Sequence, residues 1–183
     1  MNSRQLKQHV AAHISEMINL REEIVKALKL AEDPAKLVLG CIISRGFRGN
    51  RRFPVSRTVV HDNKQKLSRM AAVLILECFV MISSDGIEIE KSDQECAAKA
   101  AVDWKIRMLK EGGFGKTGEV DARGLLLFIS GFGIQDHVFN PPDIMDLMRA
   151  SNWKGISTAL CRSAFLIPKM PCMLLFCLYF LLP

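Results

Sequence analysis

Apolar residues recur at helical spacing along most of this chain, and the pattern is clearest in the stretch 91–110. One apolar face of the helix predicted there comprises Ala97, Ala100, Ala101, Trp104 and Met108. A second apolar set, on nearly the opposite side, comprises Val102, Ile106 and Leu109. A helix that is apolar on two sides contacts neighbours on both of them. The pattern therefore predicts that this helix lies between other helices rather than at the surface.

A glycine turn separates this helix from a second one that has almost no polar face. Gly112 and Gly113 supply the helix stop, since glycine readily adopts the left-handed conformation found there. Asp121 is expected to cap the next helix by accepting a hydrogen bond from its first turn. Apolar residues then dominate 125–132, which is too short to cross a bilayer core of about 30 Å. The second helix is therefore predicted to be buried on all sides.

The same spacing predicts helices along the rest of the chain. Asn2 or Ser3 can cap the first helix, and Asp33 and Asn140 each precede a proline that suits a first helical turn. Further periodic segments fall at 6–17, 20–31, 37–42, 67–82, 144–148 and 153–165. The predicted fold class is all-α, a layered array of about seven or eight amphipathic helices with no sheet.

Several of these runs resemble the FRIGIDA-like family of plant proteins. The most specific are AAVDWKIRMLKEGG and EVDARGLLLFISGFGI, and LREEIVKALKLAEDPAKLVLGCI and DIMDLMRASN agree with them. The resemblance covers residues 1–168 in one collinear order. It implies that 1–168 are the N-terminal part of a FRIGIDA-like helical domain, and that 169–183 form a divergent apolar tail. The eleven apolar residues 172–182 fall short of the roughly 20 that a membrane helix needs.

The resemblance also implies a function. Members of this family are nuclear factors that assemble transcription-regulating complexes and influence flowering time and development. The chain is accordingly expected to be a non-enzymatic scaffold whose partners are other proteins of a nuclear regulatory complex. The N-terminal run MNSRQLKQHV shows no signal peptide, so the chain is expected inside the cell. The resemblance implies the nucleus as its location, with the cytoplasm as the alternative and a membrane disfavoured.

The net charge of +6 is concentrated in one region. Eight Lys or Arg residues lie within 45–69, against the single acidic residue Asp62. The candidate contacts for an acidic partner are Arg45, Arg48, Arg51, Arg52 and Arg57. The alternative interpretation is a nucleic-acid-binding helical module that uses this 45–69 region, because arginines pair with phosphates and the neighbouring Phe47 and Phe53 can stack on bases. No RNA-binding motif accompanies the charge, so a solvated connector between helices is the favoured interpretation of this loop and direct nucleic-acid binding is the weaker one.

No other pattern predicts chemistry. His9 and His13 have the spacing of two metal ligands but lack a third, and the six cysteines lack zinc-site or disulfide spacing. The sequence EGGFGKTGE is not a phosphate loop, since Lys110 stands where its first glycine is required. We therefore expect no catalytic residue, no cofactor, no bound metal and no small-molecule substrate.

Overall fold

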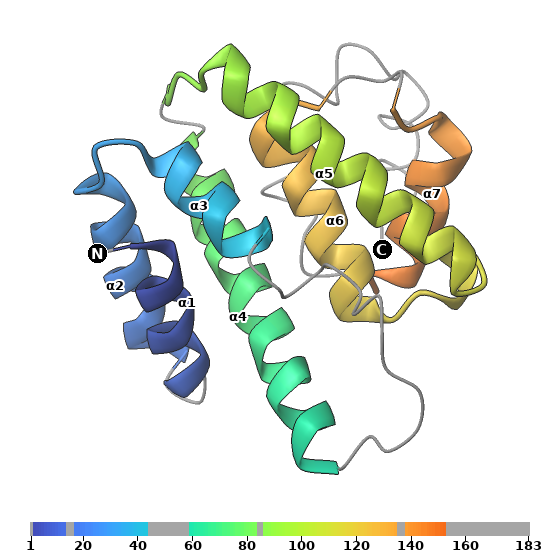
Figure 1. Ribbon diagram of the computed structural model, residues 1–183, viewed down its shortest axis with the longest axis horizontal. Coiled ribbons are helices and arrows are strands. Elements are labelled where there is room, and N and C mark those ends of the chain that lie inside the picture. Colours follow the sequence, from blue (N-terminus) through green and yellow to red (C-terminus); the bar gives the residue numbers. More distant parts are fainter. Residues whose placement is uncertain (1, 14–16, 44–58, 84–85, 135–137, 153–183) are drawn as a thin grey trace, which may run out of the picture.

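The computed structural model describes residues 2–13, 17–43, 59–83, 86–134 and 138–152. These ranges form seven α-helices, one short 3-10 helix and no strand (Figure 1). The helices are α1 (Ser3–Ala12), α2 (Met17–Lys29), α3 (Pro34–Ile43), α4 (Val59–Ser83), α5 (Lys91–Lys110), α6 (Glu119–Phe132) and α7 (Pro141–Ala150), and the 3-10 helix η1 is Phe114–Lys116. The all-α prediction is confirmed. The helix predicted at 153–165 lies outside the described residues.

Helix α4 is the centre of the array. Helices α1, α2 and α3 pack on one side of it and α6 packs on another, while α5 and α7 pack against α6 (Figure 1). The C-terminal half of α4 is buried at nearly every position. Its buried apolar side chains are Ala71, Ala72, Val73, Leu74, Ile75, Leu76, Cys78, Phe79, Val80 and Ile82. The all-apolar run in the sequence is therefore the core helix around which the others gather.

Helix α6 is buried on almost all of its surface, as predicted. Its close approach to α4 depends on glycine: a Cβ added to Gly131 would lie 3.1 Å from Phe79 Cδ1. Aromatic rings continue the contact, with centroids 5.2 Å apart for Phe79 and Phe132 and 6.1 Å apart for Trp104 and Phe128. These distances are typical of paired aromatic rings. The rings therefore connect α4, α6 and α5 through one core.

Helix α6 begins earlier than the sequence indicated. Its N-cap is Gly118 and its first residue is Glu119, so the prediction that Asp121 is the cap is wrong. Asp121 lies in the first helical turn and is buried. Its carboxylate pairs with arginines from two other helices, and no local sequence rule could have indicated those partners.

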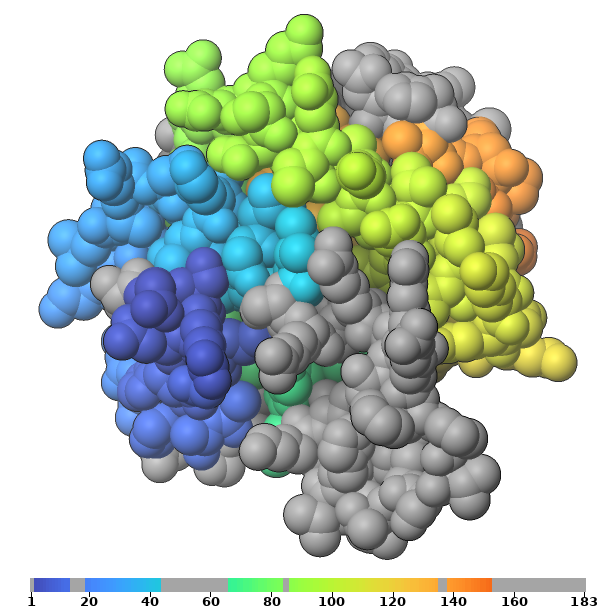
Figure 2. Space-filling model, in the orientation of Figure 1, coloured from blue at the N-terminus to red at the C-terminus, as the bar shows by residue number. Residues whose placement is uncertain are grey.

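Helix α5 has one buried side instead of two. Ala97, Ala101, Trp104 and Met108 are buried as predicted. On the opposite side Val102, Ile106 and Leu109 are 38%, 44% and 51% exposed. The prediction that α5 lies between neighbours on both sides is therefore wrong, and α5 runs along the outside of the molecule (Figure 2). The charged residues Lys99, Asp103 and Lys110 are exposed as well, so this side of α5 is a mixed surface in contact with water.

Several predicted helix starts are confirmed by their hydrogen bonds. The Asn2 side chain accepts from the Gln5 amide, and Asn140 accepts from the Asp143 amide, each within a complete capping box. The Asp33 side chain accepts from the amide of Lys36 at 2.8 Å. These local signals fix where α1, α3 and α7 begin.

The predicted turn after α5 is also confirmed. Gly112 and Gly113 have φ values of 117° and 86°, a conformation that other residues rarely adopt. The short helix η1 follows and leads into α6. Within the described ranges, no helix is both long enough and apolar enough to cross a membrane.

Candidate protein-interaction surfaces

Charged side chains between the helices join them to one another. Glu77 is the one charged residue in the apolar half of α4, and its side chain is only 12% exposed. Its two carboxylate oxygens lie 2.5 Å from Arg21 of α2 and 2.5 Å from Arg123 of α6. Arg21 and Arg123 are 39% and 31% exposed, so they neutralise the carboxylate while they stay partly hydrated. Glu77 therefore connects three helices.

A second carboxylate joins α4, α5 and α6. Asp121 of α6 lies 2.7 Å from an Arg69 nitrogen and 3.5 Å from an Arg107 nitrogen. Arg69 is the last basic residue of the 45–69 region, so its charge is used within the fold. Arg107 also lies beside the Trp104 ring, with its guanidinium carbon 6.0 Å from the ring centroid.

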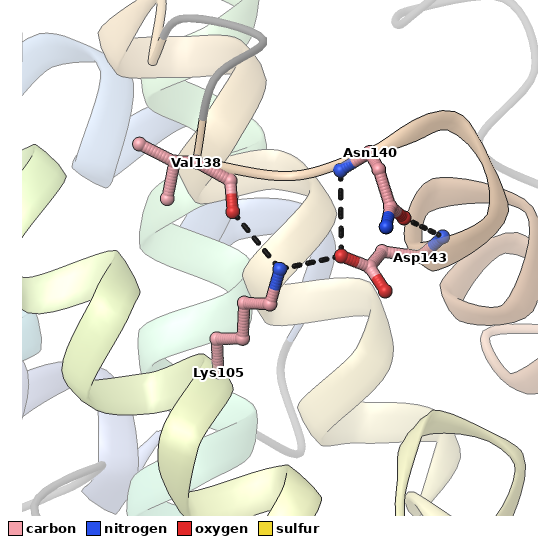
Figure 3. Close-up of polar contacts among 4 residues, drawn as sticks. All are labelled: Lys105, Val138, Asn140 and Asp143. Carbon is pink, nitrogen blue, oxygen red and sulfur yellow. Dashed lines mark hydrogen bonds and ion pairs between the residues drawn. The ribbon is translucent and has the colours of Figure 1, made fainter.

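A third carboxylate, that of Asp143, joins α5 to the start of α7 (Figure 3). Lys105 Nζ donates to the Asp143 carboxylate at 2.5 Å and to the Val138 carbonyl at 3.0 Å. The same carboxylate accepts from the Asn140 amide, so it closes the α7 capping box as well. The Lys105 ammonium also lies 5.1 Å from the centroid of the Phe139 ring. One lysine therefore positions the segment that leads into α7.

Lys7 of α1 binds to the C-terminal end of α3. Its ammonium donates to the Cys41 carbonyl at 2.9 Å, one of the last carbonyls of that helix. A cation at a helix C-terminus is favourable, because these carbonyls lack partners within the helix. Burial nevertheless lowers the pKa of Lys7, and the proximity of Cys41 only partly offsets this effect.

The described cysteines are free. Burial raises the pKa of the Cys41 thiol to about 11, and burial raises the pKa of the Cys78 thiol to about 11. Both groups therefore remain thiols at neutral pH, and a thiol is a weak nucleophile and a poor metal ligand. Cys96 is exposed.

The histidine pair noted in the sequence belongs to the contact between α1 and α2. His9 Nε2 lies 2.9 Å from a Glu23 carboxylate oxygen, and His13 Nδ1 lies 2.9 Å from the His9 carbonyl. Across the described ranges, no three His, Cys, Asp or Glu side chains come close enough to share a metal ion.

Two groups of exposed apolar side chains stand out among the described residues. The first, called here the α5 stripe, consists of Val102, Ile106 and Leu109. The second borders the α2–α4 groove, a cavity of about 480 Å³. It is lined by Arg21, Glu22, Val25, Lys26, Lys29, Leu30, Cys78 and Met81. Leu30 and Met81 are 77% and 53% exposed.

Little in the sequence indicated this groove. Leu30 lies off the buried face of α2, which consists of Leu20, Ile24 and Leu28. The available signal was that Leu30, an apolar residue next to a lysine, is out of phase with that face. Met81 carries no such signal, because every side of α4 is apolar around it.

The five arginines predicted to contact an acidic partner are not placed by the structure. Arg45, Arg48, Arg51, Arg52 and Arg57 all lie outside the described residues. Their role stays a prediction. The same holds for the apolar tail at 169–183.

An all-helical array with charged groups between its helices and apolar groups on its surface is of the class that includes many protein-binding domains. The chain belongs to the Frigida-like protein family, whose model matches residues 1–174. The resemblance seen in the sequence is thereby confirmed. The predicted boundary at 168 between the domain and the tail stays a prediction.

The relatives carry the name of this family. Protein FRIGIDA of Arabidopsis thaliana is 39% identical over 173 residues, which are 93% of this chain and 27% of that protein. Inactive protein FRIGIDA of the same plant is 38% identical over 168 residues, which are 90% of this chain and 51% of that protein. This chain therefore spans about a quarter and about half of the length of these relatives.

A solved structure agrees with the fold. The crystal structure of a FRIGIDA flowering-time regulator superposes with a TM-score of 0.77 and 41% sequence identity. The match covers 95% of this chain and 58% of that one.

Proposed function

We propose that this chain is a non-enzymatic nuclear scaffold that assembles transcription-regulating complexes and thereby affects flowering time and development. One observation carries the proposal: 95% of the chain matches the structure of a FRIGIDA flowering-time regulator at 41% identity. Identity at that level over nearly the whole chain makes a related role the simplest expectation. The chain's partners are then other proteins of a nuclear regulatory complex.

The arrangement of polar and apolar groups supports a binding role. The side chains of Glu77, Asp121 and Asp143 are only 12%, 12% and 17% exposed, and each carboxylate is paired with a cation from another helix. Groups engaged in this way hold the array together. The α5 stripe and the α2–α4 groove, in contrast, place large apolar side chains in water, and exposed apolar surfaces commonly mark sites of protein association.

The proposal is tested by purifying the tagged full-length chain from plant nuclear extract, with the tag alone as the control. We expect the chain in the nuclear fraction, together with a reproducible set of transcription regulators that the tag alone does not retain. A chain that is excluded from nuclei, or that retains the same proteins as the tag, would contradict the scaffold function.

The alternative function is nucleic-acid binding through the 45–69 region, favoured by its eight basic residues against one acidic residue. Because Arg69 is paired with Asp121, fewer of these charges are free to neutralise phosphates. Binding of this kind weakens steeply as salt rises, since counterions are released from the phosphates. An affinity for duplex DNA or RNA that does not change between low and physiological salt would remove the alternative.

A further inference from the structure

The α2–α4 groove combines a cavity with exposed apolar walls. Leu30 at the end of α2 and Met81 of α4 stand on its two sides, and both are largely in water. Cys78 is fully buried and Val25 is half-buried, so these two line the deeper part. Two exposed side chains of this size beside a cavity of about 480 Å³ form a site that an apolar side chain can enter.

The lining favours a protein side chain over a small polar ligand. Sites for small molecules usually combine an apolar wall with several polar groups that converge on the ligand. In this groove the wall is almost entirely apolar, because the long charged residues that line it contribute mainly their aliphatic stems, and the exposed Lys26 and Lys29 stand at its rim. An apolar groove between two helices, with charges at its rim, is the usual receptor for one face of an amphipathic helix.

The rim charges specify the partner further. Arg21 is neutralised by Glu77 at 2.5 Å. Lys26 and Lys29 are both exposed and make no ion pair with any residue in the described ranges, whereas Glu22 is the single acidic residue of the lining. The free charge at the rim is therefore predominantly positive, and it is complementary to an acidic flank.

We propose that the α2–α4 groove docks one amphipathic helix of a partner protein, whose large apolar residues insert between Leu30 and Met81 and whose acidic residues face Lys26 and Lys29. The inference deepens the proposed scaffold function and rests on it for the class of partner. The apolar anchors of such a helix recur at intervals of three and four residues, because these positions share one face. The acidic residues border that face on the side of the lysines.

The test uses a model peptide as the probe. The peptide is a helix-stabilised chain of about fifteen residues, with leucines at the three- and four-residue spacing and glutamates beside them. It is titrated into the full-length chain while the methyl NMR signals of the protein are followed. We expect the signals of Leu30 and Met81 to shift and that of Ile106, in the α5 stripe, to stay in place.

Variants separate the groove from the rest of the surface. Leu30→Ser removes one wall, and Lys26→Glu with Lys29→Glu reverses the rim charge; each is expected to weaken binding of the acidic peptide by about tenfold or more. The charge-reversed variant is expected to bind a peptide in which lysines replace the glutamates. Ile106→Ser, an equally exposed apolar residue on another helix, is the matched control and is expected to leave the affinity unchanged.

Three results would overturn the proposal. The first is a peptide affinity that is the same for the charge-reversed variant, for Leu30→Ser and for the wild type. The second is the absence of binding to the wild-type chain. The third is concentration-dependent dimerisation of the chain alone that Leu30→Ser abolishes, since the occupant would then be a second copy. The purification from nuclei does not depend on this titration, so a failure here removes the groove assignment and leaves the scaffold function standing.

Discussion

Glu77 lies in the most apolar stretch of the chain, and its two arginine neighbours explain why α4 tolerates a carboxylate there. Arg21 and Arg123 come from α2 and α6, so the pairing connects segments far apart in the sequence. The sequence showed that Glu77 interrupts an apolar run, but it could not show which cations reach it. Partner choice in a buried ion pair depends on how helices pack, and no local pattern encodes that.

Removing the charge of Glu77 is expected to destabilise the fold. Glu77→Gln removes the charge that two partly exposed arginines share, and losing charged hydrogen bonds of this kind should lower the free energy of unfolding by roughly 1–3 kcal/mol. Urea denaturation of the purified chain measures this change. The control is Asp146→Asn, which breaks the exposed pair of Asp146 with Arg149 and is expected to change stability by less than about 1 kcal/mol. Equal effects of the two substitutions would show that Glu77 does not join the helices.

The buried thiols give the stability a defined dependence on pH. Burial raises the pKa of Cys41 to about 11 and that of Cys78 to about 11, from 9.0 for an exposed thiol. Between pH 9 and 11 the unfolded chain therefore releases protons that the folded chain retains. The unfolded state binds fewer protons in this window, so the free energy of unfolding falls as the pH rises. Lys7 acts in the opposite direction, because its lowered pKa makes the folded chain release its proton first.

The contribution of one thiol can be measured alone. Cys78→Ala removes one titrating group, so the decline of stability between pH 9 and 11 should become shallower by up to about 1.4 kcal/mol per pH unit. Denaturation curves at several pH values in that window give the slope. Val80→Ala, which truncates a buried apolar side chain of the same helix, is the control: it should lower the stability at every pH and leave the slope as it is. A slope that Cys78→Ala does not change would mean that this thiol is not protected by burial.

At the scale of single helices, the sequence predicted the positions of the helices better than it predicted which of their sides are buried against neighbours. The caps at Asn2, Asp33 and Asn140 and the stop at Gly112 all depend on groups within a few residues, and all are confirmed. Which side of α5 is buried depends instead on how the other helices pack against it. Helical spacing identified both apolar sides of α5, but a stripe of three apolar residues among charged ones is compatible with solvent, and that is where it lies.

The two sides of α5 are expected to respond differently to substitution. Trp104 is 3% exposed and packs against Phe128, so Trp104→Ala should lower the free energy of unfolding by roughly 3–5 kcal/mol. Ile106 is 44% exposed, and Ile106→Ala should change it by no more than about 0.5 kcal/mol. Thermal or urea melts of both variants provide the comparison. A large loss for Ile106→Ala would indicate that its side of α5 is covered after all.

The candidate surfaces were harder to predict than the helices. The sequence drew attention to the arginines of 45–69. Arg69, the arginine of that group that lies within the described residues, pairs with Asp121 of α6. The α2–α4 groove arises only when the end of α2 is placed beside Met81, about fifty residues later in the chain. Composition reveals a charged region directly, but a groove between two helices becomes visible only in three dimensions.

The molecule as a whole is a helical array built on α4, with its charged groups divided between two roles. Buried carboxylates join helices, while the lysines around the α2–α4 groove remain at the surface. The family match and the similarity to a FRIGIDA flowering-time regulator are the grounds on which we propose that this surface binds regulatory proteins. A scaffold needs a packed interior and accessible apolar side chains, and both occur in the described part of the chain.

Flowering time in plants is the most direct measure of the proposed role. Plants in which the gene for this chain is disrupted are expected to flower at an altered time, and the full-length wild-type chain is expected to restore the original time. The destabilised Trp104→Ala variant is expected to restore it poorly. The Ile106→Ala variant, whose stability is nearly unchanged, is expected to restore it. Disrupted plants that flower at the same time as unmodified plants would contradict a role for this chain in the control of flowering.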